Sequence, residues 1–390
     1  MEASNTKDAG MKELEILTEL TETLVNPFIN EWKKQGKKVI GYYCPYMVEE
    51  IIYAAGALPY RIRGTESKST ADADEYLHST NCSFCRNVLD LALKGKYTFL
   101  DGFAAVNSCD HIRRMFDLWR KGYVALPYSP YFLHLISTPY ITKDYAVEQF
   151  KSELITFKDN LAKYLGVEIT EEALRDAIRA CNESRRLLKK LYEFRKRAAP
   201  PISGAQTLAV VIAGTCMPKA EYNQMLGKLV EELDSAKGIS GYRARLMVVG
   251  SEIDDPDLVK LIEDCGGLVV ADYTCYGPIY FWDPVDESLD AMEGLARRYL
   301  RRLSCPRMVE EHGSRTRFIE KMVEDFVING LIFQRLLYCD VWSGERAMLA
   351  WKTKEAGIPF LSLERDYLIG AVGNLKVRIE AFIEMIGDEI

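Results

Sequence analysis

Short apolar runs alternate with amphipathic stretches through the first third of the chain. After an opening helical pattern at residues 12–36, the apolar runs of strand length lie at residues 38–44, 58–64, 99–108 and 123–127. The stretches with helical periodicity between them lie at residues 45–56, 82–94 and 111–121. Strands that alternate with helices in this way predict a parallel sheet covered by helices.

The pattern changes between residues 143 and 196, where it predicts long, charged, amphipathic helix. The segment AAPPISG at residues 198–204 then supplies the turn residues of a domain boundary. Beyond it, the strand-like apolar runs lie at residues 208–216, 245–250, 267–275, 330–339 and 358–363. The helical patterns among them lie at residues 219–234, 255–265 and 345–355.

We therefore predict an α/β fold with two doubly wound parallel-sheet domains joined by a helical connector. The predicted boundaries are residues 1–142 for the N-terminal domain, 143–200 for the connector and 201–390 for the C-terminal domain. A length of 390 residues suits two domains, because single hydrophobic cores stop growing beyond roughly 250–300 residues.

Charge and composition exclude several classes of function. The net charge is -7 and the sequence has no basic block, which argues against nucleic acid as a partner. The polar, acidic N-terminus and the strand-sized apolar runs predict neither a signal peptide nor a membrane span. Because the sequence also has no G-x-x-x-x-G-K-[ST] loop, we do not expect this chain to hydrolyse ATP itself.

The chain has ten cysteines and no secretion signal, which indicates a reducing cytoplasmic compartment where thiols serve metals or catalysis. Five of them fall at the predicted carboxyl ends of strands: Cys44, Cys109, Cys216, Cys275 and Cys339. Ligands of open parallel sheets bind outside that edge, so these thiols are candidates for a site. Three others are interpreted as small buried hydrophobes: Cys181, Cys265 and Cys305.

Cys109 and Cys339 are each followed by aspartate and then by a predicted helix. The positive N-terminus of a helix lowers a thiol pKa and favours the thiolate that ligates iron. A further pair, Cys82 and Cys85, forms a C-x-x-C just before another helix. His111, two residues beyond Cys109, is a candidate to donate a hydrogen bond or a proton near these thiols.

The C-x-x-C pair alone fits a zinc knuckle, a redox dithiol or a pair of iron–sulfur ligands. A structural zinc site usually shows a second closely spaced ligand pair, and the sequence has none. A thioredoxin-like dithiol would leave Cys109 and Cys339 unexplained. The cysteines at strand ends therefore favour an iron–sulfur site, although the pair itself leaves all three open.

Several segments carry a resemblance to a known family. They are GYYCPYMVEEIIYAAGALPYRIRG at 41–64, NCSFCRNVLD at 81–90, DGFAAVNSCDHIRRMFDLW at 101–119, LIFQRLLYCDVW at 331–342 and EAGIPFLSLERDY at 355–367. Together they resemble the 2-hydroxyacyl-CoA dehydratase and benzoyl-CoA reductase family. They run nearly from end to end, and their joint order is more specific than any single cysteine pair.

The resemblance implies that Cys82, Cys109 and Cys339 ligate a 4Fe-4S cluster between the two α/β domains. Three thiolates leave one iron open, and in this family that iron can hold water, a sulfur ligand or the carbonyl oxygen of an acyl-CoA. The sequence adds three further candidate ligands: Cys85, Cys44 and Cys275. Six ligands would suit the double-cubane cluster proteins that resemble this family, which keeps the double cubane as an alternative. The single cubane is our first expectation.

The resemblance also implies low-potential, one-electron chemistry on a thioester. The expected partners are a homologous second cluster-bearing subunit and an ATP-hydrolysing activator with its own 4Fe-4S cluster. The length and the CSFCRN segment look most like the smaller, C-type subunit of ATP-dependent benzoyl-CoA reductase, which implies reduction of an aromatic acyl-CoA. Arg61 and Arg63 would then meet the phosphates of coenzyme A. The alternatives are a subunit of a radical 2-hydroxyacyl-CoA dehydratase and a double-cubane electron-transfer protein.

Overall fold

The computed structural model describes residues 11–121, 131–368 and 372–387. These residues contain two four-stranded sheets, with the strand orders β2-β1-β3-β4 and β6-β5-β7-β8. All neighbouring strands are parallel. The first sheet consists of β1 (Val39–Tyr42), β2 (Leu58–Arg61), β3 (Gly102–Val106) and β4 (Phe132–Ile136). The second consists of β5 (Ala244–Gly250), β6 (Gly267–Tyr273), β7 (Gly330–Leu336) and β8 (Phe360–Arg365).

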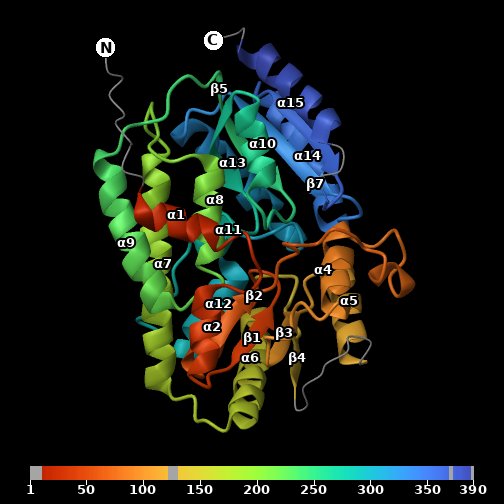
Figure 1. The fold of residues 1–390 in the computed structure, drawn as a ribbon, viewed down its shortest axis with the longest axis vertical. Coiled ribbons are helices and arrows are strands. Elements are labelled where there is room, and N and C mark those ends of the chain that lie inside the picture. The colour runs from red at the N-terminus through yellow and green to blue at the C-terminus, as the bar shows by residue number, and fades with distance from the viewer. Residues whose placement is uncertain (1–10, 122–130, 369–371, 388–390) are drawn as a thin grey trace, which may run out of the picture.

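The two sheets share one topology, because in each the strand order reverses between the first and third strands. Helices flank both sheets, as Figure 1 shows, so the predicted α/β fold with two parallel sheets is confirmed. The precise domain boundaries stay a prediction. None of the helices in the described ranges is long and apolar enough to cross a membrane.

In the first half the helices are α1 (Lys12–Glu19), α2 (Pro27–Lys34), α3 (Glu49–Ala54), α4 (Ser83–Leu93) and α5 (Asp110–Arg120). The two long helices α6 (Asp144–Leu165) and α7 (Glu171–Phe194) follow. The N-terminal helix α1 does not stay with the first sheet. It packs on α8 (Gly204–Ala213) and α9 (Lys219–Ser235) of the second half, as Figure 1 also shows.

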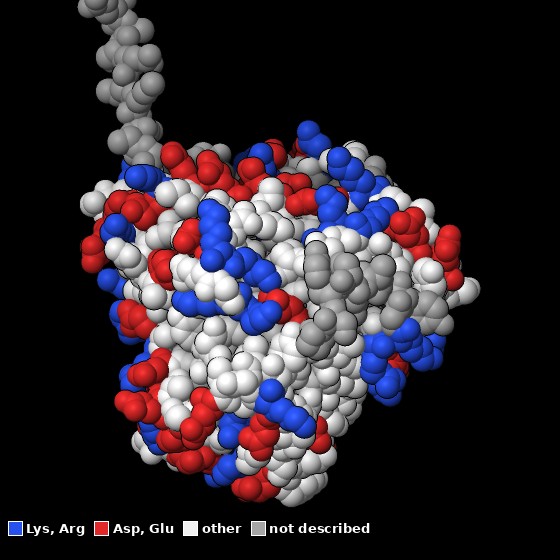
Figure 2. Space-filling view, turned by 60° about the horizontal axis from the view of Figure 1, so that its bottom comes forward, with Lys and Arg blue, Asp and Glu red and all other residues white. Residues whose placement is uncertain are grey.

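The remaining helices surround the second sheet and extend back to the first. They are α10 (Asp257–Asp264), α11 (Pro278–Phe281), α12 (Ala291–Arg301), α13 (His312–Asp325), α14 (Asp340–Glu355) and α15 (Val372–Gly387). On the face of the molecule in Figure 2, side chains of both charge signs are interspersed around uncharged areas.

One predicted strand is wrong, and another lies outside the described residues. Residues 208–216 were expected to form a strand, but residues 204–213 form α8. Ser203 caps this helix by accepting from the backbone of Gln206, and the Gln206 side chain accepts from the Ser203 N–H. Because α8 is apolar and buried on nearly all sides, its sequence lacks the one-sided pattern that marks a surface helix. The predicted strand at residues 123–127 falls outside the described ranges.

Candidate functional site

One cavity of about 110 Å³ is lined by loops that follow strands of both sheets. Seven of the ten cysteines form part of its wall: Cys44, Cys82, Cys85, Cys109, Cys275, Cys305 and Cys339. Most of the remaining wall is apolar: Tyr43, Pro45, Ile62, Phe84, Ile112, Leu336, Val341 and Trp342. We call this space the cysteine cavity.

The topology explains why these loops meet. Strand order reverses between β1 and β3 in the first sheet, and between β5 and β7 in the second. Cys44 follows β1 and Cys109 follows β3, while Glu252 follows β5 and Cys339 follows β7. Ligands of doubly wound sheets bind at this reversal, outside the carboxyl ends of the strands. The cysteine cavity is thus built from the reversal points of both sheets.

All six cysteines that the sequence names as candidate ligands line this cavity, and their role as ligands stays a prediction. Cys305 is buried, as expected, but it also belongs to the wall, which the sequence pattern did not indicate. Its position after α12, in an irregular segment, gives no strand-end signal. The expectation that Cys216 lies at a strand end is wrong. Its thiol follows α8 and donates to the Ala213 carbonyl, 3.4 Å away.

Three of the wall cysteines cap helices. Cys82, Cys109 and Cys339 are the N-cap residues of α4, α5 and α14. The backbone N–H groups of each first turn act to lower the pKa of the thiol, although no capping hydrogen bond to the sulfur forms. The four N–H groups at a helix start have no partner within the helix, so this arrangement supplies donors and a positive dipole end to each sulfur.

The pKa values depart from the sequence-based expectation for two of these cysteines. Burial raises the pKa of Cys109 to about 12, and burial also raises the pKa of Cys339 well above its ordinary value. The helix N-termini act in the expected direction, but burial outweighs them. Only the pKa of Cys82 is lowered, chiefly because the Cys85 thiol donates a hydrogen bond to it. The cysteine cavity by itself therefore presents mostly neutral thiols at neutral pH.

The backbone beside the cavity is strained at two positions. Cys44 has φ 68° and Tyr338, which precedes Cys339, has φ 64°. A left-handed conformation costs an L-residue roughly 1–2 kcal/mol. Among the described residues only four non-glycine residues have positive φ, and two of them lie here. Strain of this kind gathers at functional sites.

His111 connects two of the loops from outside the cavity wall. Its Nδ1 accepts from the Cys82 N–H at 3.4 Å, and its Nε2 lies 3.1 Å from the Asp340 carboxylate. Asp340 follows Cys339, so the ring joins the start of α4 to the start of α14. This places His111 near the thiols, and its role as a proton donor stays a prediction.

A larger cavity of about 730 Å³ adjoins the cysteine cavity. The two share Ser108, Cys109 and Val341. His111 also lines the larger cavity, together with Asp110, Tyr140, Pro306, Arg307, Val309, His312, Arg315, Asp340, Gly344, Glu345 and Met348. Because Val309 is 76% exposed, this cavity reaches the protein surface. It therefore offers a route from solvent to Cys109.

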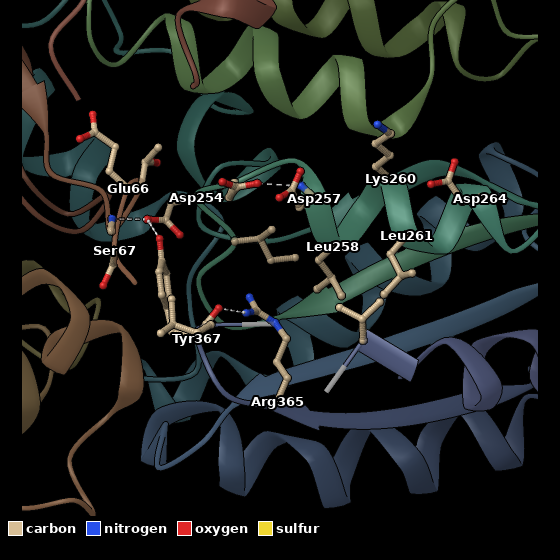
Figure 3. A pocket seen from close by; sticks show the side chains of 16 residues that line it. Glu66, Ser67, Asp254, Asp257, Leu258, Lys260, Leu261, Asp264, Arg365 and Tyr367 are labelled. Carbon is tan, nitrogen blue, oxygen red and sulfur yellow. Dashed lines mark hydrogen bonds between the residues drawn. The ribbon is translucent and has the colours of Figure 1, made fainter. Parts of the chain in front are cut away.

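A third cavity, of about 460 Å³, lies on the other side of the loop after β5. Figure 3 shows Asp254 in its wall, where the carboxylate accepts from the Gly64 N–H at 2.7 Å and the Tyr367 hydroxyl at 2.9 Å. Arg365 in the same wall donates to the Glu252 carbonyl. Since Ser251 and Glu252 line the cysteine cavity instead, this short loop separates the two spaces.

Two arginines expected to meet phosphates are unavailable for that role. Arg63 is fully buried and donates to backbone carbonyls of residues 20–23. Arg61 is 1% exposed and donates to Glu252 and to the Cys275 carbonyl, both at 2.8 Å. Its guanidinium also lies over the Tyr276 ring. Both arginines position loops, so the expectation that they bind coenzyme A is wrong.

The thiols surround a volume rather than a point. In the ranges that the structure covers, no three His, Cys, Asp or Glu side chains lie close enough to hold a single metal ion. A structural zinc site would bring four ligands to one centre.

Comparisons with known proteins agree with the motifs. The family model of the 2-hydroxyglutaryl-CoA dehydratase D-component matches residues 44–386. The C subunit of benzoyl-CoA reductase from Thauera aromatica is 26% identical, over 91% of this chain and 93% of its own. The beta subunit of (R)-2-hydroxyglutaryl-CoA dehydratase from Acidaminococcus fermentans is 26% identical, over 91% and 94%. YjiM of Escherichia coli, a candidate dehydratase subunit, is 27% identical, over 92% and 94%.

Proposed function

Since this chain belongs to the family of the 2-hydroxyglutaryl-CoA dehydratase D-component, we propose that it is the iron–sulfur subunit of an ATP-dependent, low-potential reductase. The observation that carries the proposal is the set of seven cysteines, from loops of both sheets, around one cavity. The relatives include a benzoyl-CoA reductase subunit and dehydratase subunits, so the choice between a reductase and a lyase is part of the proposal.

The residues present fit an iron–sulfur cluster by donor type and number. Cysteine thiolates are the usual ligands of such clusters, and each cubane with one open iron needs three. Cys82, Cys109 and Cys339, at the three helix N-termini, would hold one cubane. Cys44, Cys275 and Cys305 are further thiols on the same cavity, and they would hold a second. The thiol count thus favours the double cubane over the single cubane that was our first expectation.

Bound there, a cluster would supply electrons one at a time at low potential. The chain's own residues would tune and protect it. The first-turn N–H groups of α4, α5 and α14 lie at three of the sulfurs and would stabilise their negative charge as thiolates. The apolar wall, with Phe84, Ile112 and Trp342, offers water few hydrogen-bond partners in the cavity. The Arg61–Glu252 ion pair fixes the loop that carries Cys275.

We further propose that substrate reaches the site through the larger, 730 Å³ cavity, whose wall includes Cys109 and His111. His111 would then hold a proton on Nε2 at the entrance, with Asp340 orienting the ring. The similarity to the C subunit of benzoyl-CoA reductase favours an aromatic acyl-CoA as the substrate. ATP hydrolysis would fall to a separate cluster-bearing activator, and a homologous second subunit would make up the rest of the enzyme in the reducing cytoplasm.

Iron analysis of the anaerobically purified chain tests the cluster. A double cubane would give about eight irons per chain, and a single cubane about four. Cys305→Ala should lower the iron content, whereas Cys181→Ala, which removes a buried thiol outside the cavity, should not. If the wild type and Cys305→Ala both held about four irons per chain, the single cubane would stand instead. A wild-type chain without iron, after anaerobic reconstitution, would refute the proposal.

The substrate is tested with the reconstituted complex, its activator, ATP and a strong reductant. Benzoyl-CoA and a 2-hydroxyacyl-CoA are offered in parallel under strict anaerobiosis. Reduction of benzoyl-CoA is the expected result. Turnover of only the hydroxyacyl thioester would assign the chain to a dehydratase, and turnover of neither, with the cluster intact, would favour a double-cubane protein with another acceptor.

A further inference from the structure

Two buried arginines flank Cys305 without a carboxylate partner. Arg302 and Arg307 are each 5% exposed. Neither forms an ion pair with any acidic side chain that the structure describes. Arg307 donates only to uncharged acceptors, chiefly the backbone carbonyls of Ser108, Thr138 and Pro139. The two guanidiniums therefore place positive charge inside the protein with no anion beside them.

Arg302 is the less satisfied of the two. Its Nη1 donates to the Leu303 carbonyl at 3.3 Å, while its Nε and Nη2 are buried without a hydrogen-bond partner. Leaving buried donors of a charged group unpaired is energetically unfavourable, because they lose their hydrogen bonds to water without replacement. By contrast, the buried Arg61 and Arg185 each face a carboxylate. Other buried arginines without a carboxylate, such as Arg63 and Arg245, donate to several backbone carbonyls instead, whereas Arg302 has neither a carboxylate nor a full set of acceptors.

Both guanidiniums lie over one aromatic ring. The Arg302 guanidinium is 4.6 Å from the centre of the Tyr46 ring, and that of Arg307 is 5.0 Å from it. Tyr46 comes two residues after Cys44, and it is itself buried. Cation–π contacts hold the guanidiniums in place but do not neutralise them.

The stacked group is tied to the Cys44–Cys305 side of the cysteine cavity, because the arginines flank Cys305 in the chain and Tyr46 follows Cys44, while Arg307 also lines the adjoining larger cavity. Cys44 and Cys305 belong to the wall, whereas Tyr46, Arg302 and Arg307 do not. The charges still act on the thiols. Burial raises the pKa of Cys305 to about 11, with Cys44 adding to the rise, while Arg307 and Arg302 oppose it.

We propose that Arg302, held on Tyr46 beside Arg307, compensates the negative charge of the cluster at Cys44 and Cys305 and raises its reduction potential. The inference rests on the proposed function, because it requires a cluster in the cysteine cavity. A reduced cluster carries one more negative charge than its oxidised form. A nearby cation in a low-dielectric interior therefore stabilises the reduced form more, which makes the potential less negative.

The test compares Arg302→Gln and Arg302→Lys with Arg301→Gln, all reconstituted anaerobically. Arg301 is the matched control, because it neighbours Arg302 in sequence but pairs with Asp144 at the surface. Iron content, circular dichroism and an EPR-monitored redox titration are measured for each. Arg302→Gln should shift the potential to a more negative value, Arg302→Lys should restore most of it, and Arg301→Gln should match the wild type.

Each other outcome is decisive. An unshifted potential in Arg302→Gln, with normal iron, overturns the inference while the proposed function stands. Loss of iron in a folded Arg302→Gln, with iron kept in Arg302→Lys, supports a requirement for charge. Loss of iron in both folded variants overturns the inference, since cluster binding would then need the shape of the arginine side chain rather than its charge. Absence of iron from the wild type would instead refute the proposed function itself.

Discussion

Replacing Glu50 by Gln should destabilise the cluster-free chain by about 3–5 kcal/mol, the usual cost of removing one partner from a buried ion pair. Glu50 lies in α3 with no exposed surface, and Arg185 on α7 is 3% exposed. The carboxylate accepts from the Arg185 guanidinium and, at 2.7 Å, from the Tyr299 hydroxyl of α12. Gln removes the charge, so Arg185 would remain buried without a counter-ion. The network also ties the helix after the Cys44 loop to the second half of the chain.

Urea unfolding monitored by circular dichroism measures this loss, with linear extrapolation of the free energy of unfolding. The matched control is Glu183→Gln, which removes an exposed pair with Arg186 on α7 and should cost less than about 1 kcal/mol. Adding Arg185→Met to Glu50→Gln should recover part of the loss, because it removes the stranded charge. A loss below about 1 kcal/mol, or a double variant no more stable than the single one, would refute the electrostatic reasoning.

The lowered pKa of Glu50 sets the direction in which the stability contribution of the Glu50–Arg185 pair changes with pH. Burial alone would raise the pKa of Glu50, but Arg185, Arg298 and Tyr299 together outweigh burial and lower it. A carboxyl whose pKa is lowered in the folded state stabilises the fold above its unfolded pKa. That contribution is lost as the pH falls through the folded pKa. The stability gap between the wild type and Glu50→Gln should therefore close on acidification.

Two further changes should stabilise the chain. Burial raises the pKa of Asp255 to about 6, from an ordinary 3.8, so its protonated form favours the fold and this contribution is lost as the pH rises through about 6. Asp255→Asn should then raise the free energy of unfolding by roughly 1–3 kcal/mol at pH 8 and change it little at pH 4; an equal effect at both pH values would contradict this. Val327 has φ 51° in the turn that ends α13, so Val327→Gly should raise the free energy of unfolding by about 1 kcal/mol. The control Val377→Gly, within the helix α15, should lower that free energy in the same urea titration.

The sequence predicts most of the fold because strand and helix periods differ. Seven of the eight observed strands overlap predicted ones, and β4 is the strand that the prediction did not find within the described residues. The failure at residues 204–213 has a physical cause. An apolar run that is buried on nearly every side carries no period that separates a helix from a strand. The capping box of Ser203 and Gln206 was the available signal.

The candidate site, like the fold, is predicted from the sequence only where its residues carry a local signal. Strand ends and helix starts are local features, so they place Cys44 and Cys109 at the carboxyl edge of the first sheet, and Cys275 and Cys339 at that of the second. Cys305 follows no strand, and only the tertiary path after α12 brings it to the wall. The burial of Arg61 and Arg63 also depends on distant segments, since their partners lie in other loops. Local pattern cannot reveal whether a cation faces solvent, a carbonyl or a cavity.

The balance between burial and helix N-termini also bears on the proposed cluster. Raised thiol pKa values and a largely apolar wall limit the negative charge in the cluster-free cavity, where the Glu252 carboxylate is paired with Arg61. Metal binding requires the thiolates and so releases protons, which couples cluster insertion to pH. The helix N-termini, whose lowering effect on the pKa of Cys109 and Cys339 is outweighed by burial, would then face thiolate anions and stabilise them. The backbone N–H groups at these helix starts do not ionise the buried thiols by themselves, but they would stabilise the thiolates of the cluster-bound site.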